Sequence, residues 1–113
     1  MPDPQKPGTH LLPRPDTDRK ERLRKAPLYH VILHDDDKHT YQYVVVMLMR
    51  LFGKTAEQAY QHAREVDTTG VTIVDTTTLE RAELKRDQIR AFGADPLIED
   101  SPGSMSATIE PAE

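Results

Sequence analysis

The sequence lacks cysteine and tryptophan entirely and has only two phenylalanines among its 113 residues. Without cysteine there is no disulfide framework and no thiolate zinc site, so a small domain must be held together by its apolar core. No apolar run approaches the roughly 18 to 20 residues that a membrane-spanning helix needs, and the first residues show no apolar signal segment. The length excludes a multidomain enzyme. We therefore expect one small cytoplasmic domain with no membrane contact.

Charge and proline are distributed unevenly along the chain. The formal net charge is -4, but residues 1–26 carry 7 of the 15 basic side chains and only 4 of the 19 acidic ones. The same segment holds five of the nine prolines, which remove backbone donors and interrupt any helical period. We expect residues 1–26 to be a disordered basic arm, residues 27–99 to be the folded domain, and the small polar residues 100–113 to be a disordered tail.

A basic arm is one feature of nucleic-acid-binding proteins. This arm has no interleaved aromatic residues, the chain contains no recognised nucleic-acid-binding motif, and the acidic body would repel phosphate. We therefore expect no nucleic-acid partner.

The folded region shows alternating strand and helix signals. Residues 29–34 are rich in aromatic and β-branched side chains and precede a run of aspartates, which is typical of a strand. From Thr40 the apolar residues recur every three or four positions, which predicts an amphipathic helix ending at Gly53. Capping-box patterns open two further helices, at Thr55–Gln58 and at Thr77–Glu80.

Two more strands complete the prediction. Val71–Val74 is β-branched, and Pro96–Glu99 can supply a short closing strand with proline at its first residue. The order strand, helix, helix, strand, helix, strand indicates a small α+β domain, in which three helices pack on one face of a three-stranded, mainly antiparallel sheet.

The densest polar cluster, residues 34–39, lies between the first strand and the first helix. Its two imidazoles and three carboxylates form neither a helical histidine pair nor a calcium-binding loop. A catalytic nucleophile is also missing, because there is no cysteine and all three serines lie in the tail. We therefore expect no metal, no cofactor and no enzymatic activity.

Two interpretations of this cluster remain open. The aspartates can serve as an N-terminal cap and favourable charge for the first helix. Alternatively, they can bind the ammonium group of a peptide's free N-terminus, whose apolar first side chain would enter a neighbouring pocket.

At this cluster the chain resembles the ClpS family, small adaptors that deliver substrates to the Clp AAA+ unfoldase and protease. Tyr29–Asp37 is similar to the family pattern Y-x-V-I-L-x-N-D-D. Further similarity lies in Phe52-Gly53, Glu57-Gln58-Ala59, Glu65-Val66-x-x-x-Gly70, Thr77 with Glu80-x-x-Glu83-x-Lys85, and Pro96-Leu97. The resemblance implies the same order of elements and a mobile N-terminal extension that takes part in delivery.

The resemblance also implies recognition of N-degrons, that is, of proteins that begin with a bulky apolar residue. The substrate ammonium would meet Asp35, Asp36 and Asp67. The side-chain pocket would be lined by His39, Val44, Ala63, Val66 and Leu97, with Tyr41 as its gate.

The implied partner is the N-terminal domain of a ClpA- or ClpC-type unfoldase, bound by a monomeric adaptor. Glu80 and Lys85 would contact it. A simpler interpretation makes Val44, Val66 and Leu97 ordinary core residues, and makes Glu80 and Lys85 ordinary solvated charges.

Several positions depart from the family pattern. The family usually has Asn at Asp35, Thr at His39, Met at Tyr41, Met at Ala63 and His at Asp67. Added carboxylates strengthen the attraction for an ammonium but repel one another in the empty site. We interpret the chain as a divergent member whose pocket accepts a different first side chain, for example a basic one. The alternatives are a member that has lost N-degron binding and a non-proteolytic interaction module.

Overall fold

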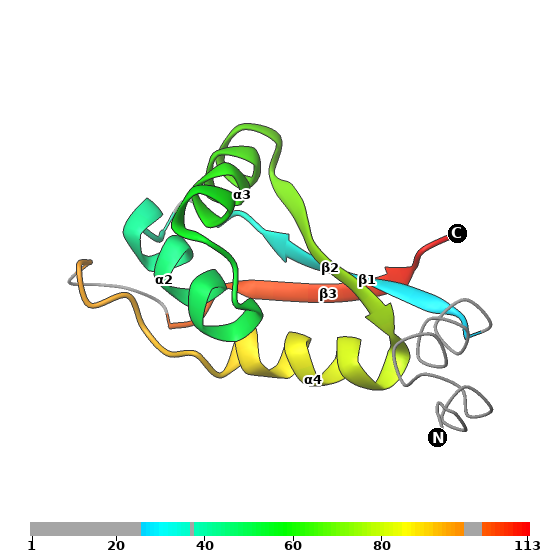
Figure 1. Ribbon diagram of the computed structural model, residues 1–113. Helices are drawn as coiled ribbons and strands as arrows, with labels where there is room; N and C mark the ends of the chain where they lie inside the picture. Colours follow the sequence, from blue (N-terminus) through cyan, green and yellow to red (C-terminus); the bar gives the residue numbers. More distant parts are fainter. Residues whose placement is uncertain (1–25, 37, 99–102) are drawn as a thin grey trace, which may run out of the picture.

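The computed structural model describes residues 26–36, 38–98 and 103–113. The elements are β1 (Leu28–His34), α2 (Tyr41–Phe52), α3 (Ala56–Thr69), β2 (Val71–Thr78), α4 (Leu79–Arg90) and β3 (Ser106–Pro111) (Figure 1). This order confirms the predicted α+β class with three helices and three strands. The predicted arm, apart from Ala26, lies outside the described residues.

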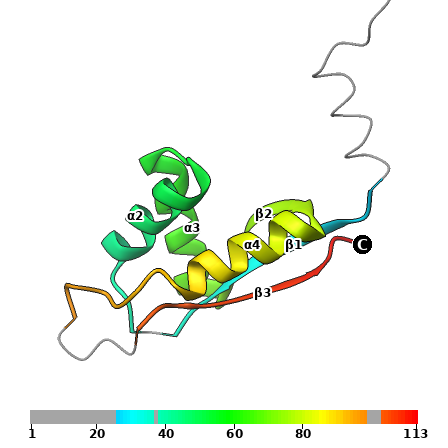
Figure 2. The same cartoon turned by 90° about the horizontal axis from the view of Figure 1, so that it is seen from below.

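The sheet has the order β2-β1-β3, and both pairs of strands are antiparallel. The three helices lie on one side of it (Figure 2). Val31 and Leu33 of the central strand are fully buried, whereas Val71 and Ile73 of β2 are 43% and 46% exposed. Side chains alternate between the two faces of a strand, so one face of the sheet carries the core and the other is left open.

The predicted position of the third strand is wrong. Pro96 and Leu97 lie in a turn, in which the backbone N–H groups of Leu97 and Ile98 donate to the Asp95 side chain and carbonyl at 2.9 and 3.2 Å. An Asp-Pro pair favours such a turn, because the aspartate side chain bonds to backbone just beyond it. The third strand is β3, inside the predicted disordered tail.

The signal for β3 is weak because it is an edge strand with a polar outer side. Met105 and Ala107 are buried and alternate with exposed Ser106 and Thr108. The strand pairs with β1 from His34 to Tyr29. Residues 103–113 therefore belong to the folded domain.

The helices begin and end largely where the sequence predicts. Thr40 caps α2, and Thr55 forms the predicted capping box of α3 with Gln58. Gly53 follows α2 in the left-handed region, with φ of 66°, which favours glycine. The capping box predicted for α4 is wrong, since the N-cap is Thr78 and its side chain makes no capping hydrogen bond.

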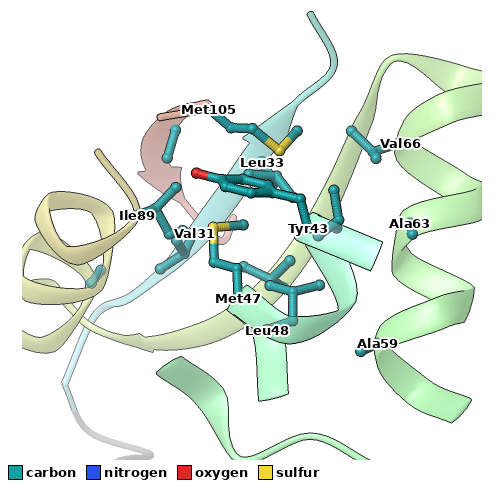
Figure 3. Close-up of a cluster of buried hydrophobic side chains, with 14 residues drawn as sticks. Val31, Leu33, Tyr43, Met47, Leu48, Ala59, Ala63, Val66, Ile89 and Met105 are labelled. Atoms are coloured by element: carbon teal, nitrogen blue, oxygen red, sulfur yellow. The ribbon is translucent and has the colours of Figure 1, made fainter. Parts of the chain in front are cut away.

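The core is built around the inner face of α2. Its side chains lie between those of α3 and those of α4 (Figure 3). Met47 and Leu48 in the middle of α2 are fully buried, and α4 packs across all three strands. The N-cap of α2, Thr40, follows the turn after β1 and contacts Asp95 in the connection that leads to β3. Among the described helices, none is both long and apolar enough to cross a bilayer.

Candidate functional site

The residues predicted to bind the substrate ammonium, Asp35, Asp36 and Asp67, come from two segments that the fold brings to one end of the domain. Asp35 follows β1, and its backbone N–H donates to the carbonyl of Gly70 at 2.9 Å. Gly70 ends α3, and Asp67 lies in the last turn of that helix. The acidic turn after β1 is therefore tied to the end of α3 that carries the third carboxylate.

Asp36 is bound within its own turn. Its Oδ1 accepts from the backbone N–H of Lys38 and contacts Nδ1 of His39, both at 2.9 Å. The other ring nitrogen of His39, Nε2, lies 2.6 Å from the carbonyl oxygen of Gly103. Since a carbonyl only accepts, the bond between Nε2 and Gly103 has the histidine ring as its donor.

His39 is therefore an internal connector and not a residue of an open pocket. Its side chain is only 1% exposed and its ring stacks on Tyr43 with centroids 4.6 Å apart. It joins the acidic turn to the segment before β3. No local sequence pattern predicts this contact, because Gly103 lies 64 residues further along the chain.

Asp95 is the carboxylate that accepts hydrogen bonds from Thr40, the N-cap of α2. Its Oδ2 accepts from the backbone N–H and the hydroxyl of Thr40 at 2.7 and 3.0 Å. Asp95 is 1% exposed. Burial alone would raise the pKa of Asp95, but hydrogen bonds from Thr40 and Leu97 outweigh it and hold that pKa below its usual value.

This arrangement excludes one interpretation of the acidic turn. The N-cap of α2 is Thr40, and the first turn of the helix contains no acidic residue. The prediction that the aspartates of the turn cap α2 is therefore wrong for the described members, Asp35 and Asp36. Among the described residues no group of three or more His, Asp or Glu side chains is arranged to hold a metal ion.

Tyr41, the predicted gate, is hydrogen-bonded to Asp67, the third residue predicted to bind the substrate ammonium. The Tyr41 hydroxyl donates to Oδ2 of Asp67 at 2.6 Å, and this bond raises the pKa of Tyr41. The Tyr41 ring also lies 5.6 Å from the ring of Tyr60. The hydrogen bond is exposed to solvent.

These two contacts place the Tyr41 ring across α3. Tyr60, Ala63 and Asp67 are three and four residues apart, so they share one face of that helix. Tyr41 contacts both Tyr60 and Asp67, and it packs against the core cluster that contains Ala63, which is 1% exposed.

The apolar residues of the predicted pocket divide into two groups. Val44, Ala63 and Val66 are 4%, 1% and 2% exposed and belong to the core cluster. Leu97 is 57% exposed and lines a separate cavity of about 350 Å³ together with Val46 of α2. The structure therefore does not group Leu97 with the other three, because the Asp95-Pro96 turn holds it on another side of α2.

The two predicted docking residues also differ. Glu80 is exposed in the first turn of α4. Lys85 is 9% exposed, its ammonium donates to the carbonyl of Leu51, and it lies 5.4 Å from the centroid of the Phe52 ring. Burial, together with the nearby charge of Arg81, lowers the pKa of Lys85. Lys85 thus holds α4 against the end of α2, whereas Glu80 faces solvent.

Comparison with known proteins gives consistent results. The family model described as "ATP-dependent Clp protease adaptor protein ClpS" matches residues 24–97. The ClpS adapter of Synechococcus elongatus is 35% identical over 93 residues, covering 81% of this chain and 96% of that protein. The ClpS adapter of Myxococcus xanthus is 36% identical over 72 residues, covering 64% and 67%.

A solved structure supports the same fold. Agrobacterium tumefaciens ClpS2 bound to L-phenylalaninamide superimposes with a TM-score of 0.67 at 22% identity, over 77% of this chain and 99% of that one.

Proposed function

Because the chain belongs to the ClpS family, the adaptors of the ATP-dependent Clp protease, we propose that it binds the N-terminal residues of substrate proteins and docks on the N-terminal domain of a Clp AAA+ unfoldase. The A. tumefaciens relative was solved with L-phenylalaninamide. That ligand has an α-ammonium group and an apolar side chain, the two features that this proposal assigns to a substrate N-terminus.

The observation that carries the proposal is the position of Asp35, Asp36 and Asp67 around one end of the domain. Asp35 and Asp67 are connected through the backbone of Gly70 at the end of α3. A carboxylate accepts several hydrogen bonds, so the contacts of Asp36 within the turn leave it capacity for a further donor. Three carboxylates attract an ammonium and orient it through charge-assisted hydrogen bonds.

The departures from the family pattern support an altered choice of first residue. Asp67 adds negative charge where the family usually has histidine, which favours a ligand that carries more positive charge. Tyr41 packs against the core cluster that contains Ala63 and Val66, which are 1% and 2% exposed. The first side chain of a substrate therefore meets Tyr41 and the added negative charge of Asp67, where the family usually has methionine and histidine. Both differences suit a long basic side chain.

A titration with matched peptides tests this choice. Peptides that differ only in their first residue, Phe, Leu, Arg or Met, would be titrated into the full chain, with N-acetylated versions as controls. We expect binding to require the free ammonium and the Arg peptide to bind at least as well as the Phe peptide. Ordinary tight selectivity for Phe and Leu would contradict the altered specificity. Absence of binding by every peptide would favour an adaptor that retains only the docking function.

Docking on the unfoldase is tested separately. Glu80→Ala should weaken capture by the isolated N-terminal domain of a ClpA- or ClpC-type unfoldase. Glu57→Ala is the matched control, because Glu57 is likewise an exposed acid in the first turn of a helix. Equal capture by both variants would remove Glu80 from the docking surface. Lys85 is unsuitable as a first probe, since its contact with Leu51 makes its loss a change in stability.

A further inference from the structure

We propose that Tyr41 and Asp67 form a latch over the side-chain pocket, which a substrate N-terminus must open before its first side chain can enter. The inference rests on the proposed binding of N-terminal residues. It adds a competition between Tyr41 and the first residue of the substrate for the same surface beside Asp67.

The latch joins two helices at the mouth of the predicted pocket. Tyr41 is the first residue of α2, and Asp67 lies in the last turn of α3. Their hydrogen bond is 2.6 Å long. The ring that it holds packs against the core cluster that contains Ala63 and Val66, which are almost completely buried.

Three departures from the family pattern are explained by this one arrangement. A tyrosine at position 41 reaches α3, an aspartate at position 67 accepts its hydroxyl, and an alanine at position 63 leaves room for the ring. A methionine at position 63 would extend three heavy atoms beyond the β-carbon toward the ring, so Tyr41 and Ala63 suit each other in size. Tyr60 supports the same ring from the side at 5.6 Å.

The exclusion of the substrate comes from the ring, and the hydrogen bond holds the ring in place. Asp67 has a second oxygen, so its carboxylate alone could accept both a phenol and an ammonium. The ring, however, covers the route to Ala63 and Val66. It must swing away when a large first side chain enters, and this breaks the bond to Asp67. The ammonium then supplies a stronger, charged donor for the released carboxylate.

Solvent exposure makes this exchange feasible. The Tyr41–Asp67 bond is exposed, so water can replace either partner while the latch is open. Opening therefore lowers the affinity for every large first residue by a similar factor. A variant without the hydroxyl should bind all of them more tightly without changing their order.

The test compares Tyr41→Phe with the wild-type chain in titrations of the Phe, Leu and Arg peptides. The substitution keeps the ring and removes only the hydroxyl. We expect affinity to rise about three- to tenfold for each peptide, the effect of losing one modest hydrogen bond. Tyr29→Phe is the matched control, because Tyr29 lies at the opposite end of β1 from Asp35, and it should leave each affinity unchanged.

The outcomes separate the latch from the proposed function. If the wild-type chain binds peptides and Tyr41→Phe binds them equally or more weakly, the latch is overturned while N-terminal binding stands. If neither chain binds any free N-terminus, N-terminal binding itself fails and the latch fails with it.

A second measurement needs no ligand. The tyrosine absorbance of the free chain would be titrated with base, because the Asp67 bond raises the pKa of Tyr41. Asp67→Ala should move one phenol to a lower pH, and Tyr41→Phe should remove that phenol from the titration. An unchanged titration curve for Asp67→Ala would overturn the latch.

Discussion

Two carboxylates accept hydrogen bonds beside the start of α2, and they differ in their exposure to water. Asp95 is 1% exposed and holds Thr40 and the turn at Leu97. Asp67 is exposed and holds only the hydroxyl of Tyr41 among the contacts described above. A buried carboxylate that loses its donors leaves unsatisfied groups, whereas water satisfies an exposed one. A carboxylate that accepts hydrogen bonds therefore stabilises the fold on one side of α2, whereas on the other side water can replace its hydrogen-bond donor.

The strongest test of this comparison is Asp95→Ala. It removes the acceptor of two backbone N–H groups and a hydroxyl in a buried position, so we expect the free energy of unfolding to fall by about 3 kcal/mol. Urea denaturation measures it. Asp87→Ala, an exposed acid on α4, is the control and should cost much less. A cost below that of the control would show that Asp95 is not structural.

The dependence of the free energy of unfolding on pH is a second test of the structural role of Asp95. The pKa of Asp95 is held below its ordinary value of 3.8, so the folded state prefers the ionised form. The resulting stabilisation is complete above pH 3.8 and is lost as the pH falls through the lower pKa of the folded state. In Asp95→Asn this part of the acid-induced loss should disappear. Equal slopes of stability against pH for the two chains in this range would contradict the prediction.

A smaller effect is expected from His39→Phe. The substitution keeps a ring against Tyr43 but removes both nitrogens, and with them the hydrogen bond between Nε2 and the carbonyl of Gly103. We expect a loss of about 2 kcal/mol in the free energy of unfolding. Hydrogen exchange should show faster opening of β3 than of β2, since His39 connects the turn to the segment before β3. Uniform opening of both strands would argue against a connecting role.

The two sides of the helix also differ in how well the sequence predicts them. Local patterns were sufficient for α2, α3, β1 and β2, because apolar spacing and the caps at Thr40 and Thr55 depend on neighbouring residues. The resemblance brought Tyr41 and Asp67 into one site. Their hydrogen bond joins two helices and depends on tertiary geometry that no local pattern encodes.

The errors lie where distant segments meet. Asp95 and Gly103 contact the start of α2 from 55 and 64 residues away. β3 has only Ala107 and Ile109 as alternating apolar residues, preceded by Met105, which is too weak a pattern beside a Ser-Pro-Gly segment. The position of Leu97 depends on the Asp-Pro pair before it, which favours the turn that holds Leu97 apart from Val44, Ala63 and Val66.

The smallest effect on stability is expected for Tyr41→Phe, which changes the exposed side of the helix alone. Water only partly compensates for the lost hydroxyl on Asp67, so the free energy of unfolding should fall by about 1 kcal/mol, the strength of the same bond that holds the latch closed. Urea denaturation beside His39→Phe provides the contrast. The same variant should bind peptides more tightly. The exposed contact of Tyr41 therefore governs mainly binding, whereas the buried contacts of Asp95 and His39 govern mainly stability. A loss as large as that of His39→Phe would mean that the tyrosine holds the fold, and the difference between the two sides would then disappear.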